Sequence, residues 1–209
     1  LQLTSSLFFV QLISYLSSPI ITRIYSPNSF GIFASYTSII SIISVVSTFS
    51  YELAINFPDD DDTPLVIVWL CFILLLISSL LLFFAVTIFS FLSDIDQINN
   101  LSLNQFIFLI PIGMIINGIY SPLQYLAIRY QMFSFLSKSR IRESIFGLIV
   151  TLISFRFGVI GLIIGQLSNQ IVGILGLFSS LSHKLLKVFP LKNYYLKRTF
   201  TEYSNYAIF

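Results

Sequence analysis

The residues that could do chemistry in this sequence are charged side chains at the edges of long apolar stretches. Arg23 and Arg129 each end such a stretch, and so does Glu52. Arg140 and Glu143 lie three positions apart, a spacing at which helical neighbours can pair. An arginine guanidinium can bind a phosphate group through two parallel hydrogen bonds. The arginines are therefore candidates for anion binding.

Lys138 and Arg142 lie four positions apart and share one face of a helix. Only residues 144–155 of this segment are free of charge, which is too few to cross a bilayer, so the helix must include these cations in or near its first turn. Their face could line an aqueous cavity that opens to the cytoplasm and attracts a phosphate. Equally, their long side chains could extend to the lipid headgroups. The sequence leaves both interpretations open.

Catalytic motifs are missing from the sequence: there is no Gly-x-Ser-x-Gly, no His-Glu-x-x-His and no glycine-rich phosphate loop with lysine. His183 lies in a basic stretch and is interpreted as an interfacial residue. The consecutive carboxylates Asp59–Asp62 lie between two prolines and point in different directions, so they predict a solvated loop rather than a Mg²⁺ site. The single Cys71 excludes an intrachain disulfide and a multi-cysteine metal site. We expect no enzyme, cofactor or metal.

The composition places this chain in a membrane. Charged residues make up 10% of the sequence and hydrophobic residues 56%. A soluble protein carries about a quarter charged residues, because water must solvate its surface. Five stretches contain no Lys, Arg, Asp or Glu, and each is long enough for the roughly 20 helical residues that cross a bilayer. They are residues 1–22, 24–51, 63–93, 97–128 and 157–183.

We therefore predict an all-α integral membrane protein, a bundle of six transmembrane helices in a single domain. The predicted spans are about 1–22, 29–50, 65–92, 105–128, 138–155 and 158–181. A basic segment, 182–202, follows them, and a seventh helix is expected to start over 203–209. The chain begins without Met inside an apolar stretch and ends as another begins. Both ends therefore suggest a fragment of a longer protein.

The basic residues predict the orientation of the bundle. The turns after spans one, three and five hold only Arg23 and Arg156. The even-numbered links hold nine: Arg129, Lys138, Arg140, Arg142, Lys184, Lys187, Lys192, Lys197 and Arg198. Because basic residues stay on the cytoplasmic side, the even-numbered links and the N-terminus are predicted to be cytoplasmic.

Small and hydroxyl-bearing residues recur within the spans. Gly161 and Gly165 form a GxxxG pair, which lets helix backbones approach closely. Serines recur through the first two spans, among them Ser14, Ser17 and Ser18. These serines could pack helices together or line a polar cavity, and the sequence does not distinguish the two roles.

Several motifs resemble the polysaccharide biosynthesis and O-antigen flippase family. The first turn, Thr22 to Pro27 followed by Phe30-Gly31-Ile32-Phe33, resembles the family pattern T-R-L-Y-x-P-x-x-F-G. The stretch Tyr51 to Ile55 with Pro58 resembles R-Y-E-L-A-I-x-L-P, although Ser50 stands where a basic residue is common. Residues 124–142 and 157–166 are similar to later helices of the family. The resemblance runs along essentially the whole chain.

This resemblance implies a fold and a function. Family members are about twice as long and belong to the multidrug/oligosaccharidyl-lipid/polysaccharide exporter superfamily, so this chain would be the N-terminal lobe of a two-lobed exporter. It would flip a polyprenyl-diphosphate-linked oligosaccharide across the bacterial cytoplasmic (inner) membrane. The expected partners are that lipid-linked oligosaccharide, membrane lipids, the C-terminal lobe of the same polypeptide and other polysaccharide assembly proteins, but no nucleic acid.

Site residues follow from the resemblance together with the charge pattern. Arg23, Arg129, Arg140 and Arg142 are predicted to contact the diphosphate headgroup, with Glu52 and Glu143 as pairing or gating partners. Two alternatives stay open. One is a cation-coupled multidrug exporter, which would prefer acidic residues inside its spans. The other is a membrane enzyme of polysaccharide assembly, a polymerase or transferase, which would need a large catalytic loop or converging carboxylates.

Overall fold

The computed structural model describes residues 2–58, 60, 62–92 and 109–187. These residues are helical, with short turns between the helices and no strand among them. Some predictions concern residues outside these ranges. They are the first four residues of the predicted fourth span, the greater part of the basic segment 182–202, the start of a seventh helix over 203–209, and Asp59 and Asp61.

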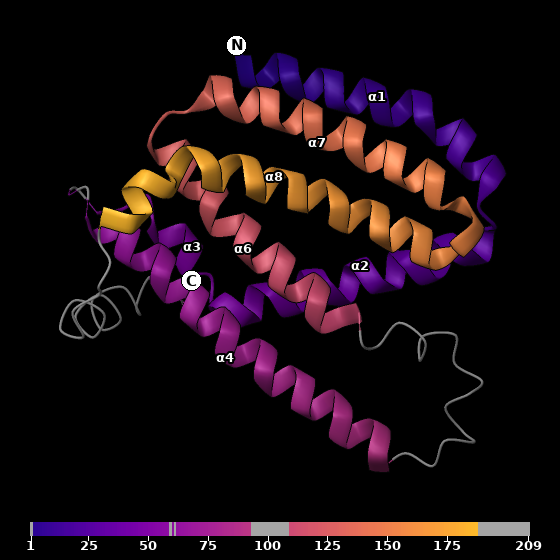
Figure 1. Cartoon of the computed structure of the whole chain (residues 1–209), viewed down its shortest axis with the longest axis horizontal. Coiled ribbons are helices and arrows are strands. Elements are labelled where there is room, and N and C mark those ends of the chain that lie inside the picture. The colour runs from indigo at the N-terminus through magenta and orange to yellow at the C-terminus, as the bar shows by residue number, and fades with distance from the viewer. Residues whose placement is uncertain (1, 59, 61, 93–108, 188–209) are drawn as a thin grey trace.

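Six long helices make up most of the described chain (Figure 1). They are α1 (Gln2–Ile24), α2 (Pro27–Thr48), α4 (Thr63–Leu92), α6 (Leu109–Arg129), α7 (Phe133–Ile153) and α8 (Val159–Lys187). A short helix α3 (Tyr51–Ala54) precedes α4, and a 3₁₀ turn η2 (Ser154–Phe157) joins α7 to α8. The six long helices coincide with the six predicted spans, with shifts at their ends.

The proline in the turn after α1 lies at the start of α2. Ser26 is the N-cap of α2, and its side-chain oxygen accepts a hydrogen bond from the backbone N–H of Ser29 at 3.2 Å. Pro27 occupies the first helical position, where its missing N–H costs nothing. The helix therefore starts two residues before the predicted span. It ends where Phe49 and Ser50 adopt left-handed backbone angles, with φ of 49° and 56°.

The fifth helix begins earlier than predicted. α7 starts at Phe133, five residues before the expected start at Lys138. Lys138, which was expected in or near the first turn, therefore lies in the second turn, and Glu143 lies in the third. The predicted spans leave only residues 156 and 157 between the fifth and sixth helices, and the link between α7 and α8 is short. It consists of η2 and Gly158, which has a φ of 57°.

Four of the helices are long and apolar enough to cross a membrane, namely α1, α2, α4 and α8. They match the first, second, third and sixth predicted spans. Helices α6 and α7 have 21 residues each and are not among these four, and α7 carries four charged residues. The expectation of a multi-pass, all-helical membrane protein is therefore confirmed for the described residues, and the count of six crossings stays a prediction.

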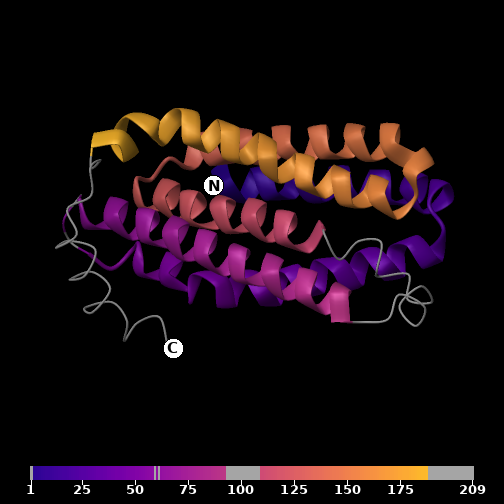
Figure 2. The same cartoon turned by 60° about the horizontal axis from the view of Figure 1, so that its bottom comes forward.

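The long helices form two groups of three (Figure 2). In one group α7 packs between α1 and α8, and in the other α2, α4 and α6 pack against one another. Helix α8 joins the groups through its contacts with α6 and α2. Polar side chains cross this junction: Asn117 of α6 donates to the Ser44 hydroxyl of α2 at 3.2 Å and accepts from Gln170 of α8 at 3.4 Å.

Candidate polar cavity

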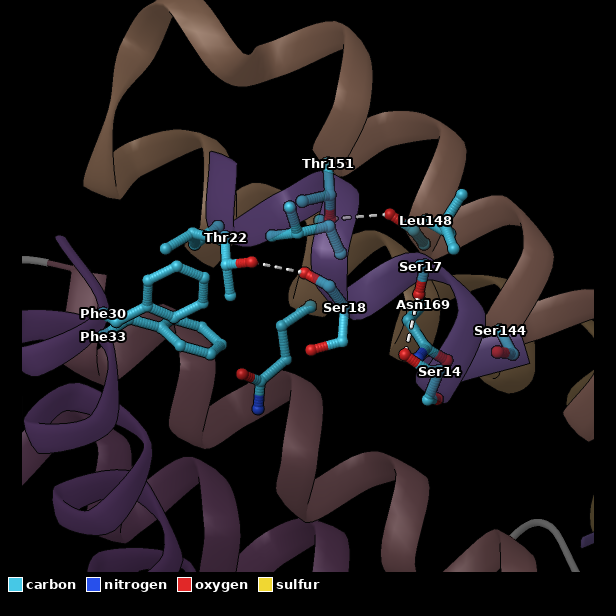
Figure 3. Close-up of a pocket in the computed structure, with 15 residues that line it drawn as sticks. Ser14, Ser17, Ser18, Thr22, Phe30, Phe33, Ser144, Leu148, Thr151 and Asn169 are labelled. Atoms are coloured by element: carbon cyan, nitrogen blue, oxygen red, sulfur yellow. Dashed lines mark hydrogen bonds between the residues drawn. The ribbon is translucent and has the colours of Figure 1, made fainter. Parts of the chain in front are cut away.

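A cavity of about 380 Å³ lies between α1, α2, α7 and α8 (Figure 3). Its lining residues are neutral, and most of the polar ones carry a hydroxyl or an amide. They are Ser14, Ser17, Ser18, Ile21, Thr22, Phe30, Phe33, Ser144, Gly147, Leu148, Thr151, Leu162, Gly165, Gln166 and Asn169. A volume of this size is within the range of small-molecule sites. The cavity can therefore offer hydrogen bonds but no formal charge to a ligand.

Helix α1 supplies a row of hydroxyl groups to this cavity. Ser17 and Ser18 lie three and four residues after Ser14, and Thr22 lies four residues after Ser18, which places all four on one helical face. The hydroxyls of Ser14, Ser17 and Thr22 donate to backbone carbonyls of their own helix at 2.9–3.1 Å. A hydroxyl oxygen that donates its hydrogen still has lone pairs that accept. The sequence left open whether the serines of α1 pack helices together or line a polar cavity. Ser14, Ser17 and Ser18 line a cavity.

The opposite wall contributes the donors. Gln166 and Asn169 of α8 are half-buried, and among the described residues neither side-chain amide makes a hydrogen bond. Helices α7 and α8 approach closely here: a Cβ on Gly165 would overlap Thr151, and one on Gly147 would lie 2.8 Å from the Cβ of Asn169. The aromatic rings of Phe30 and Phe33 lie together at one end of the cavity (Figure 3). The site thus combines amide donors, hydroxyl acceptors and an apolar wall.

A buried tyrosine holds α1 against α7 near the cavity. The Tyr25 hydroxyl donates to the backbone carbonyl of Thr151 at 2.6 Å, and Tyr25 is 3% exposed. A Cβ on Gly161 would overlap both the Tyr25 hydroxyl and the Ser154 carbonyl. The GxxxG pair therefore packs against residues of this same chain, at the start of α8.

The predicted headgroup arginines do not converge. Arg23 is exposed at the C-terminal end of α1, whereas Arg129 ends α6 at the opposite end of the bundle (Figure 1). The guanidinium of Arg129 donates to the backbone carbonyls of Ile55 at 3.1 Å and Asp60 at 3.0 Å, and also to that of Pro58. Arg129 therefore fixes the loop between α3 and α4.

Helix α7 carries the other two arginines with Glu143. The Glu143 carboxylate is buried, and it accepts from the Tyr120 hydroxyl at 2.5 Å and the Ser139 hydroxyl at 2.6 Å. Arg140 and Glu143 form no ion pair in the described part of the chain, and the buried Nε of Arg140 has no hydrogen-bond partner there. Arg142 is exposed on the helix surface.

Glu52 lies on α3 and faces the interior of the group formed by α2, α4 and α6. The Ser121 hydroxyl of α6 donates to Glu52 Oε1 at 3.4 Å, and Glu52 Oε2 is buried without a partner among the described residues. None of the six predicted site residues lines the cavity. The residues that sequence reasoning missed are Ser144, Gln166 and Asn169. Their only signal was that they are polar residues at helical spacing within or beside a charge-free stretch.

One carboxylate outside the spans has a clear structural task. The Thr63 hydroxyl and the Thr63 backbone N–H both donate to Oδ2 of Asp60, the latter at 3.3 Å. These bonds hold the start of α4, and the bond from the hydroxyl is the main reason that the pKa of Asp60 lies below its usual value. Asp60 is exposed, as the prediction of a solvated acidic loop requires.

Together these features define a multi-pass helical membrane protein with an uncharged polar cavity. The chain belongs to the family of polysaccharide biosynthesis proteins, whose family profile matches residues 20–207. No curated protein and no solved structure matches the chain at a significant level. The resemblance seen in the motifs is confirmed at the level of the family, and it ties the protein to polysaccharide biosynthesis.

Proposed function

We propose that this protein flips a polyprenyl-diphosphate-linked oligosaccharide across the bacterial cytoplasmic membrane, as the N-terminal lobe of a two-lobed exporter. Its N-terminus lies in the cytoplasm, and all six long helices cross the bilayer. Transport proceeds by alternating access, in which one lobe rocks against the other and no bond is made or broken.

The packing supports six crossings. At about 1.5 Å per residue, the 21 residues of α6 and of α7 extend about 31 Å, close to the roughly 30 Å of the hydrocarbon core. Both helices pack against α8, which is apolar enough to cross by itself. Two polar residues of α7, Glu143 and Ser139, face the protein interior rather than lipid.

The observation that carries the proposal is the chemistry of the cavity. A sugar presents many hydroxyl groups and no charge, and each hydroxyl can both donate and accept. The cavity offers amides from Gln166 and Asn169, hydroxyl oxygens from α1 and the rings of Phe30 and Phe33. A cationic drug would instead require a carboxylate, and none of the lining residues has one. The cavity therefore suits the glycosyl part of a lipid-linked oligosaccharide.

The diphosphate must be bound elsewhere, because no cation lines the cavity. Of the four predicted arginines, Arg140 has a buried Nε donor without a partner among the described residues. The donors of Arg129 are occupied by the loop between α3 and α4. We therefore retain Arg140 as the first candidate for contact with the diphosphate.

The test is transport by the full-length, two-lobed protein that contains this chain, in proteoliposomes with a fluorescent polyprenyl-diphosphate oligosaccharide. An impermeant quencher reports the fraction of the probe that reaches the opposite leaflet. Replacing Gln166 and Asn169 together by Leu removes two hydrogen-bonding groups at similar volume. At about 1 kcal/mol for each bond, the rate should fall at least tenfold. The matched control is Ser35→Ala on α2, whose exposed hydroxyl only donates to the Gly31 carbonyl.

Size-exclusion profiles must show that the double variant remains folded. Transport at the wild-type rate by that variant would remove the cavity from the proposal. A wild-type protein that moves no probe but lengthens or transfers the glycan, as chromatography of the lipid products would show, would favour the membrane-enzyme alternative. Movement of a fluorescent organic cation in place of the glycolipid would favour the drug exporter.

A further inference from the structure

A second hollow, separate from the polar cavity, lies on the outer surface of α7. This groove has a volume of about 420 Å³ and is almost entirely apolar apart from two cations. Its lining residues are Lys138, Ile141, Arg142, Ile145, Phe146 and Ile149. Ile145, Phe146 and Ile149 are 44–46% exposed, so the described chain leaves almost half of each residue uncovered. In a membrane, such a surface must be covered by hydrocarbon chains or by another protein surface.

The two cations have no acidic neighbour that would neutralise them. Lys138 and Arg142 are exposed, and in the described part of the chain neither forms an ion pair. The nearest carboxylate in the sequence, Glu143, is buried on another face of α7 and is held by the Tyr120 and Ser139 hydroxyls. The groove therefore has a net positive charge at the end that Lys138 and Arg142 form.

The order of these residues along the helix matches the shape of a lipid. Lys138 and Arg142 are about 6 Å apart along the axis, and Ile149 lies about 10 Å beyond Arg142, at about 1.5 Å per residue. The cations are nearer the start of α7, and the apolar residues extend away from it. A phosphate at the cations would thus place an attached chain along Ile141, Ile145 and Ile149.

The structure also positions the guanidinium of Arg142. Its Nη2 lies against Gly176 of α8, where a Cβ would overlap it. Arg142 also borders an adjoining hollow of about 400 Å³ that includes Ser179 of α8. A cation that packs at the contact between two helices is already ordered before a ligand binds. A lysine that extends freely to the headgroup region would lose conformational freedom on binding.

We propose that this groove binds one anionic phospholipid of the surrounding bilayer. Its phosphate contacts Lys138 and Arg142, and one acyl chain follows the apolar residues of α7. The groove faces outward, where phospholipid is the abundant ligand, and its charge complements an anionic headgroup. The site is distinct from the polar cavity, and the proposal does not depend on the flippase assignment.

The test is native mass spectrometry of the detergent-purified protein titrated with dioleoylphosphatidylglycerol. We expect one tightly retained lipid, and at least tenfold weaker binding of dioleoylphosphatidylcholine. Lys138→Gln with Arg142→Gln should weaken binding of phosphatidylglycerol at least tenfold. The matched control is Arg23→Gln with Arg156→Gln, which removes the same two charges from exposed sites at the other end of the bundle. This control should retain the lipid.

A second variant tests the apolar part of the groove without changing its charge. Ile145→Trp fills the groove and should also weaken retention of phosphatidylglycerol. Equal affinity for wild type and the Lys138/Arg142 variant would overturn the proposal, and so would equal loss in the control. Displacement of phosphatidylglycerol by a polyprenyl diphosphate at lower concentration, with the same dependence on Lys138 and Arg142, would also overturn it, because the groove would then belong to the carrier lipid.

Discussion

Replacing Gly161 by Ala should destabilise the protein even though alanine is the better helix former. A Cβ at this position would overlap the backbone carbonyl of Ser154, and its distance from the Ser154 carbonyl carbon would be 2.9 Å. Because main-chain atoms cannot rotate away, η2 and α8 must separate. The same Cβ would displace the Tyr25 hydroxyl, which donates to Thr151 at 2.6 Å.

The magnitude follows from three opposing contributions. Overpacking of a close contact costs about 1–3 kcal/mol. Loss of the hydrogen bond from the Tyr25 hydroxyl adds about 1 kcal/mol. The higher helix propensity of alanine returns about 1 kcal/mol. The free energy of unfolding should therefore fall by about 1–3 kcal/mol.

The measurement is reversible unfolding of the purified protein in mixed micelles, followed by circular dichroism. The matched control is Gly31→Ala on α2, where a Cβ would meet nothing within 4 Å. That variant should be as stable as wild type or slightly more stable. Tyr25→Phe in the Gly161→Ala background should recover little stability, because the Ser154 carbonyl remains in place. If the free energy of unfolding of Gly161→Ala equalled that of Gly31→Ala, the inference that η2 and α8 approach closely at Gly161 would be wrong.

Three further predictions follow from other contacts. Glu143→Ala should lower the free energy of unfolding by about 1–3 kcal/mol for each of the two hydroxyl donors it leaves without an acceptor. Glu143→Gln should lower it less. If unfolding in micelles showed the same loss of stability for both variants, the carboxylate would not have this role. In the Arg129→Gln variant, limited proteolysis should cleave the loop between α3 and α4 several-fold faster. An unchanged cleavage rate would show that the hydrogen bonds of Arg129 do not hold this loop. Because the pKa of Asp60 is lowered in the folded state, its stabilising contribution should be present above its ordinary pKa of about 3.9 and lost as the pH falls through the folded value. The difference in melting temperature between wild type and Asp60→Asn, measured from pH 6 down to pH 3, should therefore shrink, and a constant difference would refute the bond from Thr63.

Local features of the fold were predictable because they depend on residues close together in the chain. Long charge-free stretches predicted helices, and all the long helices of the described chain except α7 lie where these stretches were found. The ends of the helices were less predictable. The second span was expected from about residue 29, yet with Ser26 as a cap the helix begins at Pro27. The cations of α7 were expected near its first turn, but their helix starts five residues earlier.

The candidate site was predicted only in part. The sequence raised the possibility that serines of the first span line a polar cavity, and Ser14, Ser17 and Ser18 do so. It did not reveal that Gln166 and Asn169 form the opposite wall, because that requires the packing of α8 against α7 and α1. The arginines were grouped by their chemistry, but the structure separates Arg23 from Arg129 and engages Arg129 with backbone carbonyls.

By itself, the sequence determined the class of protein: an apolar, charge-poor, multi-pass helical chain whose motifs place it in a polysaccharide biosynthesis family. Hydropathy and helical periodicity suffice for this, because each span must satisfy its own backbone hydrogen bonds within the bilayer. Only the tertiary structure decided which polar residues share a cavity and which charges are already engaged. A cavity forms where helices distant in sequence meet, and a cation is available to a ligand only if no other part of the chain occupies its donors.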